Sequence, residues 1–155
     1  MSWEAMTAAP VPPDRVLPVA EHCDVVIIGA GPVGLSLALS LRGSELSVRL
    51  VERQSTHDLM DPAYDGREIA LSLRTVEILK KLGAWSRIAA EEMSPLCSAK
   101  VVDGRWDSVL HFDANAVGED KLGYFVANNV IRRALYAEHA ARSDAVLMAE
   151  SEMAG

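Results

Sequence analysis

Three glycines with the spacing Gly-x-Gly-x-x-Gly are the residues of this sequence best suited to bind phosphate. They lie in the run Gly29-Ala30-Gly31-Pro32-Val33-Gly34. In such a turn the first glycine allows a sharp bend, the second lets the backbone come close to a diphosphate, and the third allows a helix to pack closely on a strand. The free amides and the positive end of that helix then face the phosphates. The run therefore predicts a site for the diphosphate of a dinucleotide.

An acidic residue lies where the ribose of such a nucleotide would bind. Glu52 comes 18 residues after Gly34, at the end of an apolar run. A carboxylate in this position can accept hydrogen bonds from both ribose hydroxyls, and it would repel a 2′-phosphate. Arg53 beside it weakens the second argument. We include both residues with the glycine run in the predicted cofactor site, although the motif alone does not separate FAD from NAD.

A strand, a helix and a second strand are expected to position these residues. Residues 25–28 are apolar and β-branched, which is typical of a strand buried on both faces. The apolar run after the glycines has the length of a helix and ends at Arg42-Gly43, a cation followed by a helix-terminating glycine. The second strand leads directly to Glu52. This βαβ arrangement is the context in which the glycine pattern indicates nucleotide binding.

The middle of the chain predicts a loop, two helices and a hairpin. Residues 54–66 are polar and rich in turn formers, and we interpret them as a loop near the ligand. The apolar spacing then indicates an amphipathic helix from about Ser72 to Gly83, followed by a short second helix over 84–90. Two strand-like runs separated by Asp103-Gly104 predict a β-hairpin.

The last third of the chain predicts a strand over 123–126, a long helix and a final strand over 145–148. Asn128 is predicted to cap the helix, which runs to about residue 142. Glu138 interrupts the apolar face of this helix, so its carboxylate is expected to lie near an edge or to need a partner. The final strand is expected to join the parallel sheet beside the βαβ unit.

Composition excludes several functional classes. The chain has 155 residues, a net charge of −7 and no run of Lys or Arg, which argues against nucleic-acid binding. Cys23 and Cys97 have neither metal nor redox spacing, so we expect reduced cysteines in a cytoplasmic protein. No apolar run approaches the roughly 20 residues of a membrane span. Residues 1–21 are rich in proline without periodicity and predict a flexible extension.

Two further segments resemble one enzyme family. Asp65-Gly66-Arg67-Glu68-Ile69-Ala70-Leu71-Ser72, followed by Leu79-Lys80-Lys81-Leu82-Gly83-Ala84-Trp85, is similar to the Asp-x-Arg…Ala-Leu-Ser…Leu-x-x-Leu-Gly-x-Trp region of ubiquinone-biosynthesis hydroxylases. Gly123-Tyr124-Phe125-Val126-Ala127-Asn128-Asn129-Val130 resembles that family's Gly-Tyr-x-Val-Glu-Asn-x-Val. With the βαβ unit, the resemblance covers residues 24 to about 148. The family belongs to the single-component, FAD-dependent aromatic monooxygenases.

The resemblance implies a fold and a reaction. The fold would be α/β, a Rossmann-like FAD-binding βαβ unit with a parallel sheet and an inserted β-hairpin, incomplete relative to the full family fold. NAD(P)H would reduce FAD, which would then transfer oxygen from O₂ to an aromatic, ubiquinone-precursor-like substrate. The protein would orient the cofactor and shield it from water. No catalytic acid, base or nucleophile is identified, and no metal site is expected.

The resemblance also implies roles for single residues. The three glycines would line the FAD pyrophosphate, Glu52 would hold the adenosine ribose, and Arg67 would reach the cofactor from the loop before the helix. Asn128 matches the family's asparagine, although a helix cap explains it equally well. Ala127 replaces the family's glutamate, so one cofactor contact is expected to be missing.

The chain lacks parts of the family pattern. Relatives carry later Asp-Gly and Gly-Asp motifs and a substrate-domain sheet, which are absent from this sequence. We therefore expect residues 22–155 to be the N-terminal portion of a truncated FAD-binding domain that is inactive alone. A non-catalytic nucleotide-binding module, with an incompletely covered sheet that favours self-association, is an alternative. An NAD-dependent oxidoreductase is a further alternative, which the hairpin disfavours. Peripheral association with the inner membrane or a biosynthetic complex also stays open.

Overall fold

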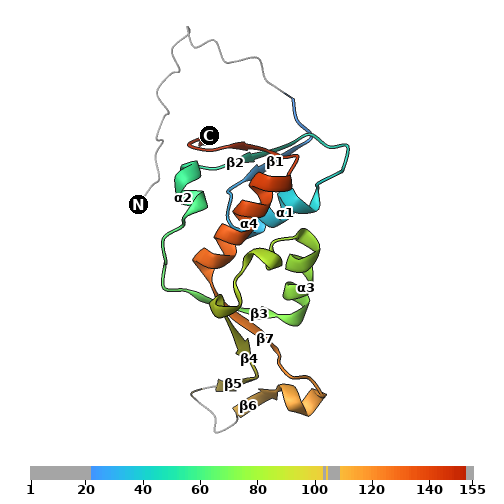
Figure 1. Cartoon of the computed structure of the whole chain (residues 1–155), viewed down its shortest axis with the longest axis vertical. Coiled ribbons are helices and arrows are strands. Elements are labelled where there is room, and N and C mark those ends of the chain that lie inside the picture. Colours follow the sequence, from blue (N-terminus) through green and yellow to red (C-terminus); the bar gives the residue numbers. More distant parts are fainter. Residues whose placement is uncertain (1–21, 103, 105–108, 153–155) are drawn as a thin grey trace, which may run out of the picture.

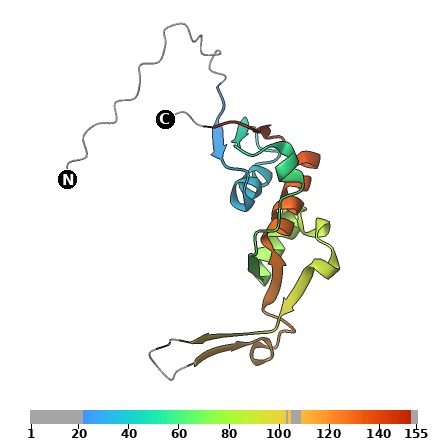
Figure 2. The same cartoon turned by 90° about the vertical axis from the view of Figure 1, so that its left-hand side faces the viewer.

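The computed structural model describes residues 22–102, 104 and 109–152. A parallel sheet with helices beside it lies at one end of the molecule, and a two-stranded hairpin extends from the other (Figure 1, Figure 2). The predicted extension over 1–21 and the hairpin residue Asp103 lie outside the described residues. Within the described part, the helices are too short or too polar to cross a membrane.

The parallel sheet is built as the sequence predicts. Its strands β1 (Val25–Ile28), β2 (Val48–Val51) and β8 (Val146–Met148) lie in the order β1-β2-β8. Helix α1 (Pro32–Ser40) connects β1 to β2 and completes the βαβ unit. The final strand pairs with β2, so the predicted α/β fold class with a parallel sheet is confirmed.

One face of the parallel sheet is covered and the other is not. Ile27, Val48 and Leu50 are buried, whereas Val26 and Ile28 on the opposite face of β1 are 50% and 68% exposed. The prediction that the first strand is buried on both faces is therefore wrong. The reason is that the described elements pack against one face of the sheet.

A second, antiparallel sheet was not predicted from the sequence pattern. It contains β3 (Glu68–Ser72), β7 (Gly123–Ala127) and β4 (Met93–Leu96) in the order β3-β7-β4. β4 contains Pro95 and is an edge strand, where the missing backbone donor is tolerated. β3 runs straight into a helix at Ser72, so no turn residues mark its end.

The predicted hairpin forms a separate two-stranded sheet. β5 (Ser98–Val102) pairs antiparallel with β6 (Val109–Asp113). Apolar side chains of both strands are exposed, including Val101 and Leu110 at 57% and 58%. Figure 2 shows this ribbon projecting away from the remainder of the molecule.

The remaining helices are α2 (Thr56–Met60), α3 (Leu73–Leu82), α4 (Asn128–Arg142) and the 3₁₀ turns η1 (Trp85–Arg87), η2 (Ala90–Glu92) and η3 (Ala114–Val117). α2 lies in the segment interpreted as a loop, where the Ser55 hydroxyl accepts the Asp58 amide and starts the helix. α3 begins at a Ser72 cap and ends at Gly83, which has φ +90°, as predicted.

Two predicted helix ends are wrong. α1 ends at Ser40, although Gly43 does adopt a left-handed φ of +74° two residues beyond its cap. α4 begins with Asn128 itself, and its cap is Ala127, which offers no side-chain acceptor. The Asn128 side chain does not cap the helix because it donates to a carboxylate in another segment.

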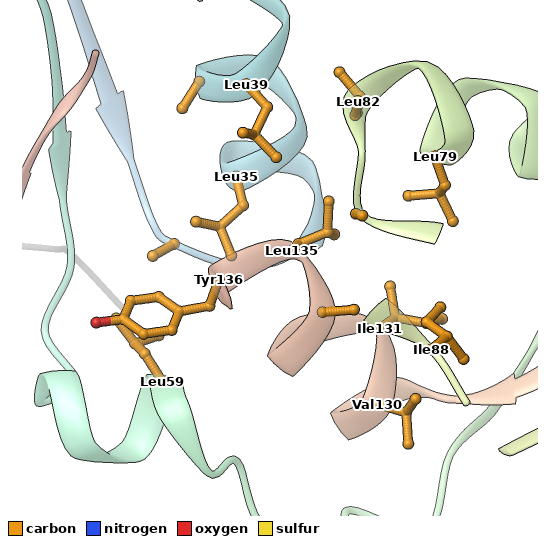
Figure 3. Close-up of a cluster of buried hydrophobic side chains, with 14 of the residues drawn as sticks. Leu35, Leu39, Leu59, Leu79, Leu82, Ile88, Val130, Ile131, Leu135 and Tyr136 are labelled. Carbon is orange, nitrogen blue, oxygen red and sulfur yellow. The ribbon is translucent and has the colours of Figure 1, made fainter. Parts of the chain in front are cut away.

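The hydrophobic core lies between the helices and joins the two larger sheets. Figure 3 shows leucines of α1 and α3 facing apolar side chains of α4, with Leu59 of α2 beside Tyr136. The buried members labelled there are Leu35, Leu39, Leu59, Leu79, Leu82, Ile88, Val130, Ile131, Leu135 and Tyr136. This core fixes the N-terminal end of α1 relative to the N-terminal end of α4. Residues at both of these helix ends line the candidate site.

Candidate nucleotide-binding site

Two of the three motif glycines in the turn between β1 and α1, Gly29 and Gly34, are required by the geometry of the backbone. Gly29 has φ +96°, and its amide donates to the Val51 carbonyl oxygen at 2.8 Å, which ties the turn to the end of β2. At Gly34 a Cβ atom would lie 1.9 Å from the Gly29 carbonyl oxygen. The first turn of α1 can therefore lie against the end of β1 only because Gly34 has no side chain.

Gly31 differs from the other two because it faces open space. It caps α1 with an extended backbone and no side-chain hydrogen bond, and a Cβ built on it meets no atom within 4 Å. Pro32 occupies the first helical position, where an N–H would have no partner in the helix. The amides of Val33 and Gly34 belong to the first turn and likewise have no intrahelical acceptor. This end of α1 therefore presents free donors and a positive dipole to whatever fills the space.

Glu52 holds the turn from the end of β2. One carboxylate oxygen accepts the Ala30 amide at 2.6 Å and the other accepts the Gln54 amide at 2.8 Å. The residue is only 8% exposed, so the charge is stabilised by these two hydrogen bonds. The side chain thus points toward the glycine turn and not away from it. Each carboxylate oxygen still has a lone pair for a further donor.

Arg67 is held by a carboxylate that the sequence prediction did not include. Its Nε and a terminal nitrogen donate to one oxygen of Asp65 at 2.9 Å and 2.5 Å, and the Asn128 side chain donates to the same oxygen at 2.7 Å. The Asn128 amide also donates to the Arg67 carbonyl oxygen at 2.9 Å. Asp65 therefore links the loop before β3 to the start of α4 and orients the Arg67 guanidinium.

Asp65 is expected to stay ionised far into the acid range. The hydrogen bonds from Arg67 and then from Asn128 hold the pKa of its carboxyl well below the ordinary 3.8. Because the folded-state pKa is depressed, the stabilising contact is complete above the unfolded pKa and is lost only as the pH falls through the folded value. We predict that Asn128→Ala raises the Asp65 pKa toward 3.8. An NMR titration of the carboxyl carbon measures it, and an unchanged midpoint would contradict the contact.

These residues surround one groove of about 520 Å³. Its lining comes from the start of α1, the end of β2, the loop before β3 and the first turns of α4, namely Gly31, Pro32, Val33, Glu52, Arg53, Gln54, Arg67, Asn128 and Arg132. A second hollow of about 370 Å³ continues past Gly29, Glu52 and Arg53 to Ser151. Three arginines and the N-termini of α1 and α4 contribute positive charge to the groove, whereas Glu52 contributes one buried negative charge. The groove is therefore suited to an anion.

The structure brings together most of the residues predicted from the sequence. Gly31, Pro32, Val33, Glu52, Arg53, Arg67 and Asn128 line the groove. Gly29 lines the adjoining hollow, while Ala30 and Gly34 shape the turn behind them. Whether each of them contacts a cofactor stays a prediction.

Two residues that line the groove, Gln54 and Arg132, were missed, and so was Asp65, the carboxylate that holds Arg67. Asp65 was quoted only as part of a motif, Gln54 was assigned to a loop, and Arg132 was not considered. The one available signal for Arg132 was its position four residues after Asn128, on the same side of a helix.

Comparison with known proteins gives a family. Residues 22–154 match the model of an FAD binding domain. The chain is 48% identical over 119 residues to "Ubiquinone hydroxylase UbiM" of Neisseria meningitidis serogroup C, which covers 74% of this chain and 26% of that protein. It is 32% identical over 150 residues to "Ubiquinone hydroxylase UbiL" of Rhodospirillum rubrum, covering 94% of this chain and 34% of the other. The chain thus spans between a quarter and about a third of these relatives' length.

A solved structure shares the fold. A flavoprotein/dehydrogenase from Cytophaga hutchinsonii superposes with a TM-score of 0.58 at 26% identity, covering 84% of this chain and 30% of that one. The βαβ unit and the sheets that follow it are therefore an arrangement also found in a larger flavoprotein.

Proposed function

Because the chain belongs to the FAD-binding-domain family, we propose that its groove binds the adenosine diphosphate half of FAD for a flavoprotein monooxygenase that hydroxylates an aromatic substrate. The observation that carries the proposal is the open space in front of Gly31, at the N-terminus of α1 and beside the Glu52 carboxylate. A diphosphate needs close backbone approach and free amides, and a ribose needs an acceptor pair nearby. The free amides of α1 and the Glu52 carboxylate lie in one groove.

The residues present fit this cofactor. The first-turn amides of α1 and the Arg67 guanidinium supply donors for the diphosphate, and the Glu52 carboxylate supplies acceptors for the ribose hydroxyls. Arg53 lines the hollow on the same side as Glu52, where the adenosine end would lie. Ala127 has no polar side chain, so we propose that the chain makes one cofactor contact fewer than it would with the family's glutamate at this position.

The chemistry itself would come from bound FAD, which accepts electrons and activates O₂. The chain's residues bind and orient it: Asp65 holds Arg67 in place, and the Asn128 side chain holds Asp65. The chain spans between a quarter and about a third of the length of its relatives. We therefore propose no independent turnover for the 155-residue chain.

Substrate and partners follow from the relatives as further proposals. Two relatives are named as ubiquinone hydroxylases, so we propose a ubiquinone-precursor-like aromatic substrate and NAD(P)H as the reductant of the complete enzyme. The exposed apolar face of β1 and the exposed hairpin support self-association of the chain or contact with a further protein or membrane surface.

FAD binding by the purified chain, measured by quenching of flavin fluorescence, tests the proposal. We predict saturable binding that Glu52→Gln weakens about tenfold, because an amide offers only one acceptor and leaves the Ala30 or Gln54 amide unpaired, at a cost of about 1–3 kcal/mol in stability as well. Glu45→Gln, which removes the same charge from an exposed position, should leave binding unchanged. A chain that does not bind FAD, or equal affinity of Glu52→Gln and the unsubstituted chain, would contradict the proposal.

A further inference from the structure

We propose that Arg132 is a phosphate-binding residue of the groove, contacting the cofactor diphosphate from α4 while Gln54 holds its guanidinium in position. The inference rests on the proposed function and adds a residue that neither the glycine motif nor the resemblance assigns. One terminal nitrogen of Arg132 donates to the Gln54 side-chain oxygen at 2.6 Å, and both residues line the groove. Arg132 would thus be a second cationic contact beside Arg67.

Within the part of the chain that the structure describes, the carboxylates around the groove leave Arg132 without a counter-ion. Arg67 is paired with Asp65, and the neighbouring Arg133 is paired with Glu92 at 2.6 Å. Glu52 is occupied by two backbone amides. Among the residues that the structure describes, the only polar partner of Arg132 is the neutral amide of Gln54. A half-buried guanidinium without a carboxylate is costly, and the cost is offset where an anion binds.

The geometry of α4 directs this charge toward the groove. Arg132 lies in the second turn of α4, and long side chains on a helix lean back toward its N-terminus. That N-terminus, at Asn128, lines the same groove. The helix dipole and the guanidinium therefore act in the same direction.

The hydrogen-bonding capacity of the guanidinium fits a diphosphate. A guanidinium has five N–H donors, and Gln54 accepts one of them, so others remain for a pair of phosphate oxygens. The backbone of Gln54 is itself fixed, because its backbone amide donates to the Glu52 carboxylate and its backbone carbonyl oxygen accepts the Glu150 amide at 3.2 Å. The Arg132–Gln54 contact thus joins the phosphate side of the groove to the ribose side.

The test compares FAD, ADP and adenosine as ligands of the full chain by calorimetry. Arg132→Gln is expected to weaken FAD and ADP about tenfold or more while leaving adenosine unchanged, because only the first two carry a diphosphate. Arg132→Lys, which keeps the charge, should recover part of the loss. Arg74→Gln removes one positive charge from an exposed surface pair on α3 and is the matched control, with all three affinities unchanged.

The outcomes separate this inference from the proposed function. Equal loss of ADP and adenosine affinity in Arg132→Gln would mean a merely structural role and would overturn the inference alone, as would unchanged ADP affinity. Gln54→Leu keeps the cation, so it should lower ADP affinity less than Arg132→Gln does. If the unsubstituted chain bound none of the three ligands, the proposed function would fall and the inference with it.

Discussion

Gly34→Ala is expected to abolish FAD binding and to lower the free energy of unfolding by about 2–4 kcal/mol. The added Cβ would lie 1.9 Å from the Gly29 carbonyl oxygen and 3.2 Å from a methyl group of Ile27. Those atoms belong to the backbone of the turn and to the core, so they cannot move aside without displacing α1 from β1. Urea denaturation and flavin fluorescence quenching measure the two effects.

Gly31→Ala is the matched control, because it adds the same methyl group three residues earlier. The backbone at Gly31 has φ −74° and ψ −179°, which alanine adopts without strain, and the methyl group would point into open space. We expect unchanged or slightly higher stability, together with weaker FAD binding because the methyl occupies the space of the diphosphate. If both variants lost stability equally, or if Gly31→Ala bound FAD normally, the assignment of separate roles to these glycines would be wrong.

Glu138→Ala is expected to destabilise the chain by about 3 kcal/mol without changing the groove. Its carboxylate, only 4% exposed, accepts a hydrogen bond from Arg87 at 2.7 Å and lies 3.6 Å from guanidinium nitrogens of Arg42 and Arg142. These arginines come from the segment after α1, from η1 and from α4. Removing the carboxylate leaves three cations close together, two of them with side chains only about a third exposed.

The control for Glu138 is Glu77→Gln, which also removes one negative charge. Glu77 pairs with Arg74 on the surface of α3, with both side chains more than half exposed, so we expect a change below about 1 kcal/mol. FAD affinity measured where both variants are folded should match that of the unsubstituted chain. A loss for Glu138→Ala no larger than that for Glu77→Gln would show that the buried cluster does not hold these elements together.

The Glu138 carboxylate also leaves no room for a side chain at the neighbouring Gly83. The residue ends α3 with φ +90°, and a Cβ there would lie 2.6 Å from a Glu138 carboxylate oxygen. The sequence alone predicted Gly83 as a helix end, and it predicted that Glu138 would need a partner. It did not identify Arg42 and Arg87, since they are 96 and 51 residues away in the chain, and it did not consider Arg142, four residues further along the same helix.

The sequence by itself determined the βαβ unit, the glycine turn and the position of Glu52. These depend on local rules: the period of a strand, the length of a helix, and glycine where a side chain cannot fit. The family's motifs extended that prediction to Arg67 and Asn128, whose contact with a cofactor stays a prediction. The match of residues 22–154 to an FAD binding domain shows the family.

Tertiary structure alone decided how these residues work together. The Asn128 side chain reaches Asp65 across 63 positions, and Arg132 reaches Gln54 across 78. It also decided that Glu52 bonds the glycine turn, that an antiparallel sheet follows the βαβ unit, and that one face of β1 is exposed. The physical reason is that hydrogen bonds between side chains distant in sequence leave no periodic pattern. The antiparallel pairing of β3 with β7 brings Asp65 to Asn128, and the packing of α2 against α4 brings Gln54 near Arg132.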